Sequence, residues 1–124
     1  MCDGGFACEL VNGVPVVAAP EEVDITHASE LRSALLEAAT RGRGTLVVDM
    51  TRTLFCDSAG LHTLLAAHRR AQAGAGELRL AISAAPVLRV FAATGIDRVI
   101  PNFTSLEQAL GHRSASKAEA VNDL

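Results

Sequence analysis

Five consecutive residues, Cys56-Asp57-Ser58-Ala59-Gly60, place a hydroxyl group behind a carboxylate where a strand is expected to end and a helix to begin. The apolar run 46–50 before them is typical of a buried strand, and apolar residues recur at helical spacing after them. The first turn of a helix has free backbone N–H groups and the positive end of the helix dipole, both of which favour an anion. Ser58 is therefore a candidate phosphorylation site, because a phosphate is stabilised there and changes the charge of the surface.

The same serine has two other interpretations. Ser58 or Asp57 can simply cap the helix, since either side chain can accept a hydrogen bond from a first-turn amide. His62 follows Ser58 by one helical turn, so the two side chains share a face and could act as nucleophile and base. However, the first glycine of a G-x-S-x-G hydrolase elbow is missing, and no acid that would orient His62 is evident. We therefore expect no catalytic residue and no enzyme activity.

Two carboxylates, Asp24 and Asp57, are expected at the same edge of the sheet, because each lies between a strand and a helix. Together they could form an acid–base pair or bind Mg²⁺, with Asp49 as a further acid. Asp49 lies inside a strand, however, and helix capping explains the other two without a metal. We expect capping, and we expect no metal site and no cofactor.

The composition limits the classes of function. The 124 residues carry a formal net charge of −3 and include neither Trp nor Tyr, so nucleic-acid binding is not expected. No apolar run approaches the roughly 18 residues of a membrane span, and the first residues show no secretion signal. Cys2, Cys8 and Cys56 lack metal-ligand spacing and are expected to be free thiols in a reducing cytoplasm. Cys56 is expected to be buried, with a low-pKa thiol as the alternative.

Apolar periodicity and turn residues predict the order of the elements. Asn12-Gly13 indicates a β-hairpin, because both positions accept positive φ angles. Thr26 is expected to cap the first helix, and Thr104 with Glu107 to form a capping box for the last. The expected strands cover residues 6–11, 14–19, 46–50, 78–82 and 98–100. The expected helices extend from Ala28 toward Gly42 and Gly44, from Ser58 to Gly74, from Pro86 to Gly95, and from Thr104 to Gly111.

This order predicts an α/β fold. Strands separated by helices give a mostly parallel sheet, and the opening hairpin makes it mixed, with four to five strands and about four helices. We expect a single domain over residues 1–112 and a polar, flexible tail over residues 113–124.

Four segments resemble, in this order and at these spacings, the anti-sigma factor antagonists of bacteria, which belong to the STAS-domain family. The resemblance covers about residues 14–110. Its segments are Glu22-Val23-Asp24, Val47-Val48-Asp49-Met50 with Phe55-Cys56-Asp57-Ser58-Ala59-Gly60-Leu61, Val90-Phe91 with Gly95-Ile96, and Leu106-Glu107-Gln108-Ala109-Leu110. Two residues depart from the family pattern. Glu21 stands where glycine is usual, and Ala59 replaces a common second serine, which leaves Ser58 as the hydroxyl of the signature.

The resemblance implies a STAS-like fold and a regulatory role in transcription and stress responses. In this family the unphosphorylated protein binds an anti-sigma factor, which then releases its sigma factor. The anti-sigma factor is often a serine kinase whose target corresponds to Ser58, and a phosphatase reverses the modification. The residues implied in partner binding are Asp24, Thr26, Asp57, Ser58, Ala59, Gly60 and His62. The alternative is a STAS module of a transport- or ligand-associated complex in which Ser58 is not phosphorylated.

Overall fold

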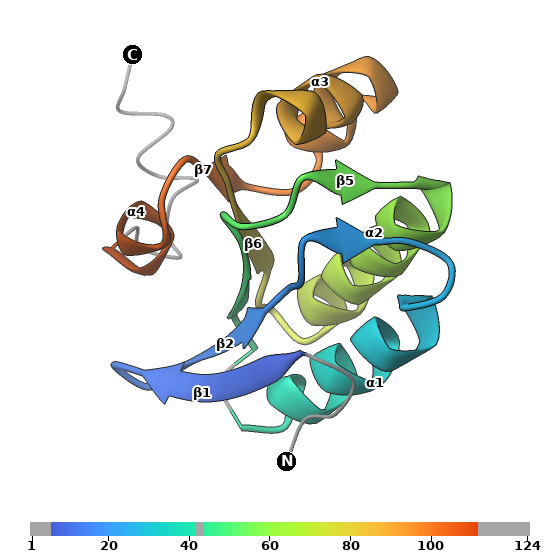
Figure 1. Cartoon of the computed structure of the whole chain (residues 1–124). Coiled ribbons are helices and arrows are strands. Elements are labelled where there is room, and N and C mark those ends of the chain that lie inside the picture. Colours follow the sequence, from blue (N-terminus) through green and yellow to red (C-terminus); the bar gives the residue numbers. More distant parts are fainter. Residues whose placement is uncertain (1–5, 42–43, 112–124) are drawn as a thin grey trace.

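The fold opens with a tight β-hairpin. The computed structural model, which describes residues 6–41 and 44–111, pairs β1 (Ala7–Val11) antiparallel with β2 (Val14–Ala18) (Figure 1). Asn12 and Gly13 have φ angles of 55° and 82°, and a type I′ turn requires positive values at both positions. The predicted hairpin is confirmed.

Five strands form one mixed sheet in the order β1-β2-β4-β6-β7. β4 (Leu46–Met50) lies parallel between β2 and β6 (Leu78–Ile82), and β7 (Asn102–Phe103) pairs with the other edge of β6. The α/β class and the mixed sheet agree with the prediction.

A second, two-stranded parallel sheet joins β3 (Glu22–Val23) to β5 (Phe55–Cys56). β3 leads toward α1 (Ala28–Ala39) and β5 leads into α2 (Ser58–Ala73), so this small sheet holds the beginnings of the two helices side by side (Figure 1). The sequence does not predict it, because two residues are too few to show a hydrophobic period.

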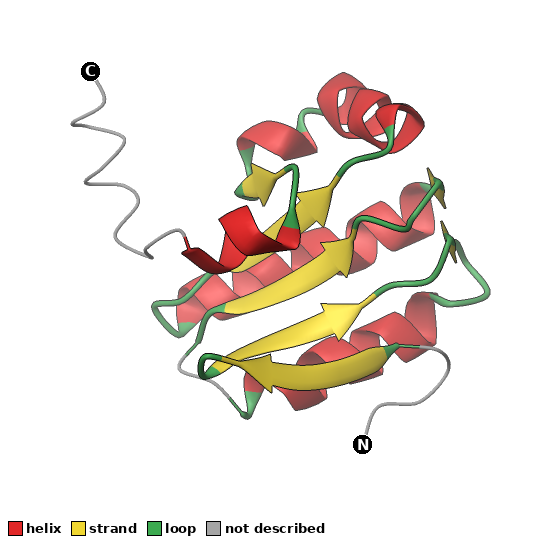
Figure 2. Cartoon of the chain, turned by 60° about the vertical axis from the view of Figure 1, so that its left-hand side comes forward, coloured by secondary structure: helices red, strands yellow, loops and turns green. Residues whose placement is uncertain are grey.

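The helices cover both faces of the main sheet. α1 and α2 lie next to each other on one face, and α4 (Leu106–Gly111) lies on the opposite face (Figures 1 and 2). No helix of the described part of the chain is long and apolar enough to span a bilayer. The bounds are α1 (Ala28–Ala39), α2 (Ser58–Ala73), α3 (Ala85–Thr94), the 3₁₀ helix η1 (Ile96–Arg98) and α4 (Leu106–Gly111).

Side chains of the central strands alternate between two cores. The larger core lies between the sheet and α1, α2 and α3, and takes Leu46, Val48 and Met50 from β4. The smaller core lies under α4 and takes Val47 from the same strand. In this smaller layer the buried Arg79 guanidinium donates to the Ala109 carbonyl at 2.9 Å, which fastens α4 to the sheet.

Two predictions about where elements begin and end are wrong. Residues 98–100 are not a strand: Arg98 and Val99 are exposed, and the chain turns through η1 before β7 begins. Thr26 does not cap α1, because its hydroxyl donates to Asp24 and the helix begins after His27.

Thr104 and Glu107 do not form the predicted capping box of the last helix, and Ser105 and Gln108 supply the hydrogen bonds at this helix start instead. The Ser105 hydroxyl accepts from the Gln108 amide at 3.1 Å, and Gln108 Oε1 accepts from the Thr104 amide at 3.3 Å. The predicted tail over residues 113–124 and the helix stop at Gly42 lie outside the described residues.

The loop after α1 and the loop after α2 touch through two glycines. Gly44 has a φ angle of +99°, and a Cβ on Gly76 would lie 2.0 Å from the Gly44 carbonyl oxygen. Neither position tolerates a side chain while the two backbones are this close.

A histidine is buried in the larger layer between α2 and β6. His68 is 1 % exposed, and its Nδ1 accepts from the Leu78 amide at 3.2 Å, so this nitrogen carries no proton. Burial lowers the pKa of His68 below its ordinary 6.5, although the Glu77 charge and the Val99 carbonyl act in the opposite direction. The folded protein therefore keeps this imidazole neutral.

This burial predicts acid sensitivity. Below pH 6.5 the unfolded chain binds a proton at His68 that the folded chain does not bind, so the free energy of unfolding should fall on acidification. The loss should reach at most about 1.4 kcal/mol per pH unit. Urea unfolding at neutral pH and at about pH 5.5 measures it. His68→Asn should be less stable at neutral pH but should lose less on acidification, and a His62→Asn control should behave like the wild type.

Candidate functional site

Asp57 caps α2 and leaves the neighbouring serine free. Its Oδ1 accepts from the Gly60 amide at 3.0 Å, and its carbonyl accepts from the Leu61 amide at 3.0 Å. Ser58 is consequently the first helical residue, and it is exposed. No hydrogen bond of the Ser58 hydroxyl is found within the described residues. Of the two candidate caps in the signature, Asp57 is the one that the structure uses.

The second carboxylate oxygen of Asp57 reaches another part of the chain. Oδ2 accepts from the Ile25 amide at 3.1 Å, and the Asp57 amide donates to the Val23 carbonyl at 3.1 Å. These bonds continue the pairing of β3 with β5 and hold the turn before α1 against the start of α2. Asp24 and Ser58 therefore lie in one region, as expected for residues at the same edge.

Asp24 organises the turn before α1 instead of capping that helix. Its Oδ1 accepts from the Thr26 amide at 3.0 Å, from the Thr26 hydroxyl at 2.5 Å and from His27 Nδ1 at 3.1 Å. The Thr26 hydroxyl contributes most to holding the pKa of Asp24 below its ordinary value. The carboxylate is thus ionised at neutral pH, and it places a negative charge near Ser58.

Exposed apolar side chains lie beside Ser58 where polar ones are usual. Ile25 is 73 % exposed and Phe55 is 51 % exposed, although Ile25 lies two residues after β3 and Phe55 belongs to β5. We call the exposed or half-buried residues of this region the Ser58 surface: Asp24, Ile25, Thr26, Phe55, Asp57, Ser58, Ala59 and His62. Sequence reasoning missed Ile25 and Phe55. No pattern in the sequence marks their exposure, because neither residue lies in a segment with a helical or strand period.

Two residues of the signature lie underneath this surface. Cys56 is buried as expected, and burial raises the pKa of its thiol to about 12, so it is not a reactive thiolate. Gly60, expected at the contact surface, is instead buried. A Cβ there would lie 2.9 Å from Cys56 Sγ, from Val23 Cγ1 and from the Val23 carbonyl oxygen. The glycine allows α2 to approach β3 and β5 closely.

Comparison with protein families and curated proteins gives one match. The family model described as "Mlab, STAS domain" matches residues 7–104. A comparison with curated protein sequences finds no match.

Solved structures with the same fold include anti-sigma factor antagonists. One from Mycobacterium paratuberculosis is 27 % identical, with a TM-score of 0.77 over 85 % of this chain and 89 % of that one. SpoIIAA in its unphosphorylated form is 23 % identical, with a TM-score of 0.68 over 86 % of this chain and 93 % of that one. SpoIIAA from Bacillus in its phosphorylated form is 22 % identical, with a TM-score of 0.65 over 86 % and 96 %.

A transport protein contains a similar domain. Murine Slc26a9, an anion transporter, is 18 % identical, with a TM-score of 0.67 over 79 % of this chain and 17 % of the transporter.

The close contact at Gly60 predicts a stability cost. Gly60→Ala should destabilise the fold by about 1–3 kcal/mol, because the added methyl group overlaps β3 backbone as well as side chains. Gly74→Ala is the matched control at the other end of α2, since a Cβ there would meet nothing nearer than 3.7 Å. Urea unfolding compares the two variants. Equal stability of both would contradict the packing described here.

The two bonds of the Asp57 carboxylate can be separated. Asp57→Asn keeps one carbonyl oxygen for the Gly60 amide but presents an NH₂ group to the Ile25 amide. We expect exchange of the Ile25 amide to accelerate about fivefold, the equivalent of about 1 kcal/mol, while the Gly60 amide keeps its protection. Hydrogen exchange followed by NMR measures both amides in one sample. Unchanged exchange at Ile25 would show that this bond does not hold the turn.

Proposed function

The chain belongs to the STAS domain family, and on this basis we propose that it is an anti-sigma factor antagonist switched by phosphorylation of Ser58. In the unphosphorylated form it binds an anti-sigma factor through the Ser58 surface, and the anti-sigma factor then releases its sigma factor. A serine kinase, the anti-sigma factor itself or a protein bound to it, modifies Ser58 and ends the complex. A phosphatase restores the binding form. The chain acts as a binding protein in the cytoplasm rather than as an enzyme.

The observation that carries this proposal is the exposed hydroxyl of Ser58, which has no hydrogen-bond partner among the described residues. Helix starts usually engage such a hydroxyl in capping, but here Asp57 accepts the hydrogen bond from the Gly60 amide. A kinase therefore reaches Ser58 without first breaking the helix cap. The exposed apolar side chains of Ile25 and Phe55 supply area that a partner can bury, at roughly 25 cal/mol per Å².

The charge around Ser58 explains how a phosphate would work as a switch. A phosphoserine adds about 1.5 to 2 negative charges. On the free protein the N-terminus of α2 stabilises this charge by roughly 0.3–1 kcal/mol, so the modified protein persists. In a complex the phosphate would be desolvated next to the carboxyl groups of Asp24 and Asp57. A hundredfold weaker affinity requires only about 2.7 kcal/mol.

A second function has support from the transporter that contains a similar domain. The chain could be the STAS subunit of a transport-associated complex, bound to its partner through the same surface without any phosphate. The two functions differ in one observable, which is phosphate on Ser58 in growing or stressed cells. Mass spectrometry of the protein purified from those cells decides between them.

Substitutions of Ser58 test the proposed switch. With a purified anti-sigma factor kinase and ATP, the wild type should gain one phosphate. Its affinity for the anti-sigma factor should then fall about a hundredfold. Ser58→Ala should stay unmodified and bound, and Ser58→Asp should bind weakly. Mass spectrometry and pull-down measure the two effects.

The matched control is Ser29→Ala. Ser29 is an exposed serine in the first turn of α1, so it tests whether any serine at a helix start is modified. This variant should be phosphorylated and released like the wild type. Phosphate on Ser29, or release of Ser58→Ala in the presence of ATP, would contradict the assignment.

A further inference from the structure

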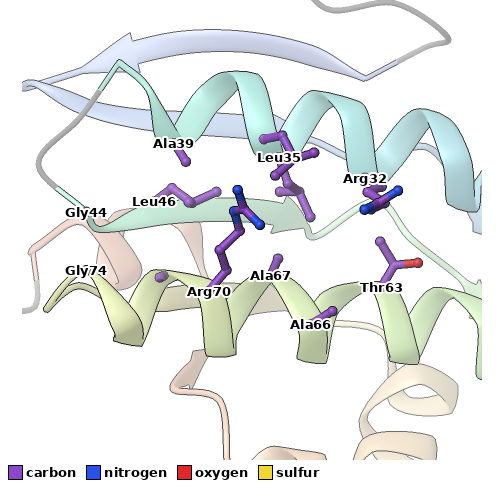
Figure 3. Close-up of a pocket in the computed structure, with 12 residues that line it drawn as sticks. Arg32, Leu35, Ala39, Gly44, Leu46, Thr63, Ala66, Ala67, Arg70 and Gly74 are labelled. Atoms are coloured by element: carbon purple, nitrogen blue, oxygen red, sulfur yellow. The ribbon is translucent and has the colours of Figure 1, made fainter.

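A groove runs between α1 and α2 on the side of the helices that faces away from the sheet (Figure 3). Its volume is about 310 Å³, at the lower end of the range for sites of small organic ligands. The buried side chains of Leu35 and Leu46 form its floor. Ala67 and Ala71 of α2 form one wall, and Leu36 and Ala39 of α1 form the other.

The groove exists because the two helices pack only through their inner faces. Leu31 and Leu35 of α1 and Leu64 of α2 fill the larger core beneath. Above them, the helices present alanines that are too short to meet across the gap, as at Ala39 and Ala67 in Figure 3. The apolar lining atoms lack contacts on one side, and a bound apolar group would supply them.

Two arginines border this apolar groove. Arg70 extends from α2 across the gap toward α1, and Arg32 extends from α1 toward α2 near Thr63 (Figure 3). Both arginines are exposed, and no carboxylate of the described residues forms an ion pair with either. Two other arginines of the described residues have acidic partners: Arg41 pairs with Glu37, and Arg79 pairs with Glu77. A guanidinium group binds carboxylates and phosphates through paired hydrogen bonds.

We propose that this groove binds an amphipathic anion, an alkyl chain that ends in a carboxylate or phosphate. The alkyl chain lies on Leu35, Leu46 and Ala67, and the head group pairs with Arg70, with Arg32 as the second positive charge. A neutral apolar ligand would leave the guanidinium groups unpaired, and a free inorganic anion would leave the apolar floor in water. The inference does not depend on Ser58 or on a protein partner, so it stands or fails separately from the proposed function.

Calorimetric titration of the full chain tests this site. Decanoate and decyl phosphate should bind, whereas acetate, inorganic phosphate and decyltrimethylammonium should not. Arg70→Gln should weaken decanoate binding about tenfold, the equivalent of roughly 1.4 kcal/mol, and Arg32→Gln should weaken it less. Ala71→Leu should block the groove and abolish binding. Arg69→Gln is the matched control, because Arg69 is exposed on the same helix but does not line the groove.

Chemical-shift changes on adding decanoate should locate the ligand. We expect them at the amides of Ala67 and Ala71, and not at Ser83 at the end of β6. Preferential binding of either anion supports the proposal, and the comparison of the two identifies the head group. Equal binding of decyltrimethylammonium, equal weakening by Arg69→Gln and Arg70→Gln, or no binding of any alkyl anion would overturn it. Urea unfolding of each variant shows that a loss of binding is not a loss of fold.

Discussion

The two hydrogen bonds that the Asp57 carboxylate accepts determine how the beginnings of α1 and α2 are arranged. One oxygen begins α2 by accepting from the Gly60 amide, and the other accepts from the Ile25 amide in the turn before α1. The same side chain thus pairs with an amide that the first turn of the helix leaves free, and it joins two segments that are 32 residues apart in the chain. Because Asp57 supplies the helix cap, the adjacent hydroxyl of Ser58 is exposed and makes no hydrogen bond within the described residues.

Residues with a fixed conformational preference made much of the fold predictable. Asn12-Gly13 determines the hairpin, Pro86 and Gly95 bound α3, and the apolar run 46–50 is the strand at the centre of the sheet. The predictions failed where only two or three residues determine whether a strand forms. β3 and β5 are too short for a period, and residues 98–100 look like a strand although only Ile100 of the three is buried.

The candidate site was predictable in its polar residues and not in its apolar ones. Asp24, Asp57 and Ser58 stand out because their types and positions suggest chemistry. Ile25 and Phe55 do not, because exposure of an apolar side chain is a property of the folded surface and leaves no pattern in the sequence. The groove between α1 and α2 is similar in this respect. Alanines at helical spacing predict close packing, and only the structure shows that a gap of about 310 Å³ remains.

The contact between Gly44 and Gly76 has a consequence for how relatives of this protein can diverge. A Cβ on Gly76 would meet backbone atoms of Gly44, so no change of a neighbouring side chain could make room for it. A second substitution in a neighbouring side chain therefore cannot compensate for a larger residue at position 76. A relative that carries a larger residue at position 76 must have rebuilt the connection between α1 and β4, and an insertion or deletion there should accompany the substitution.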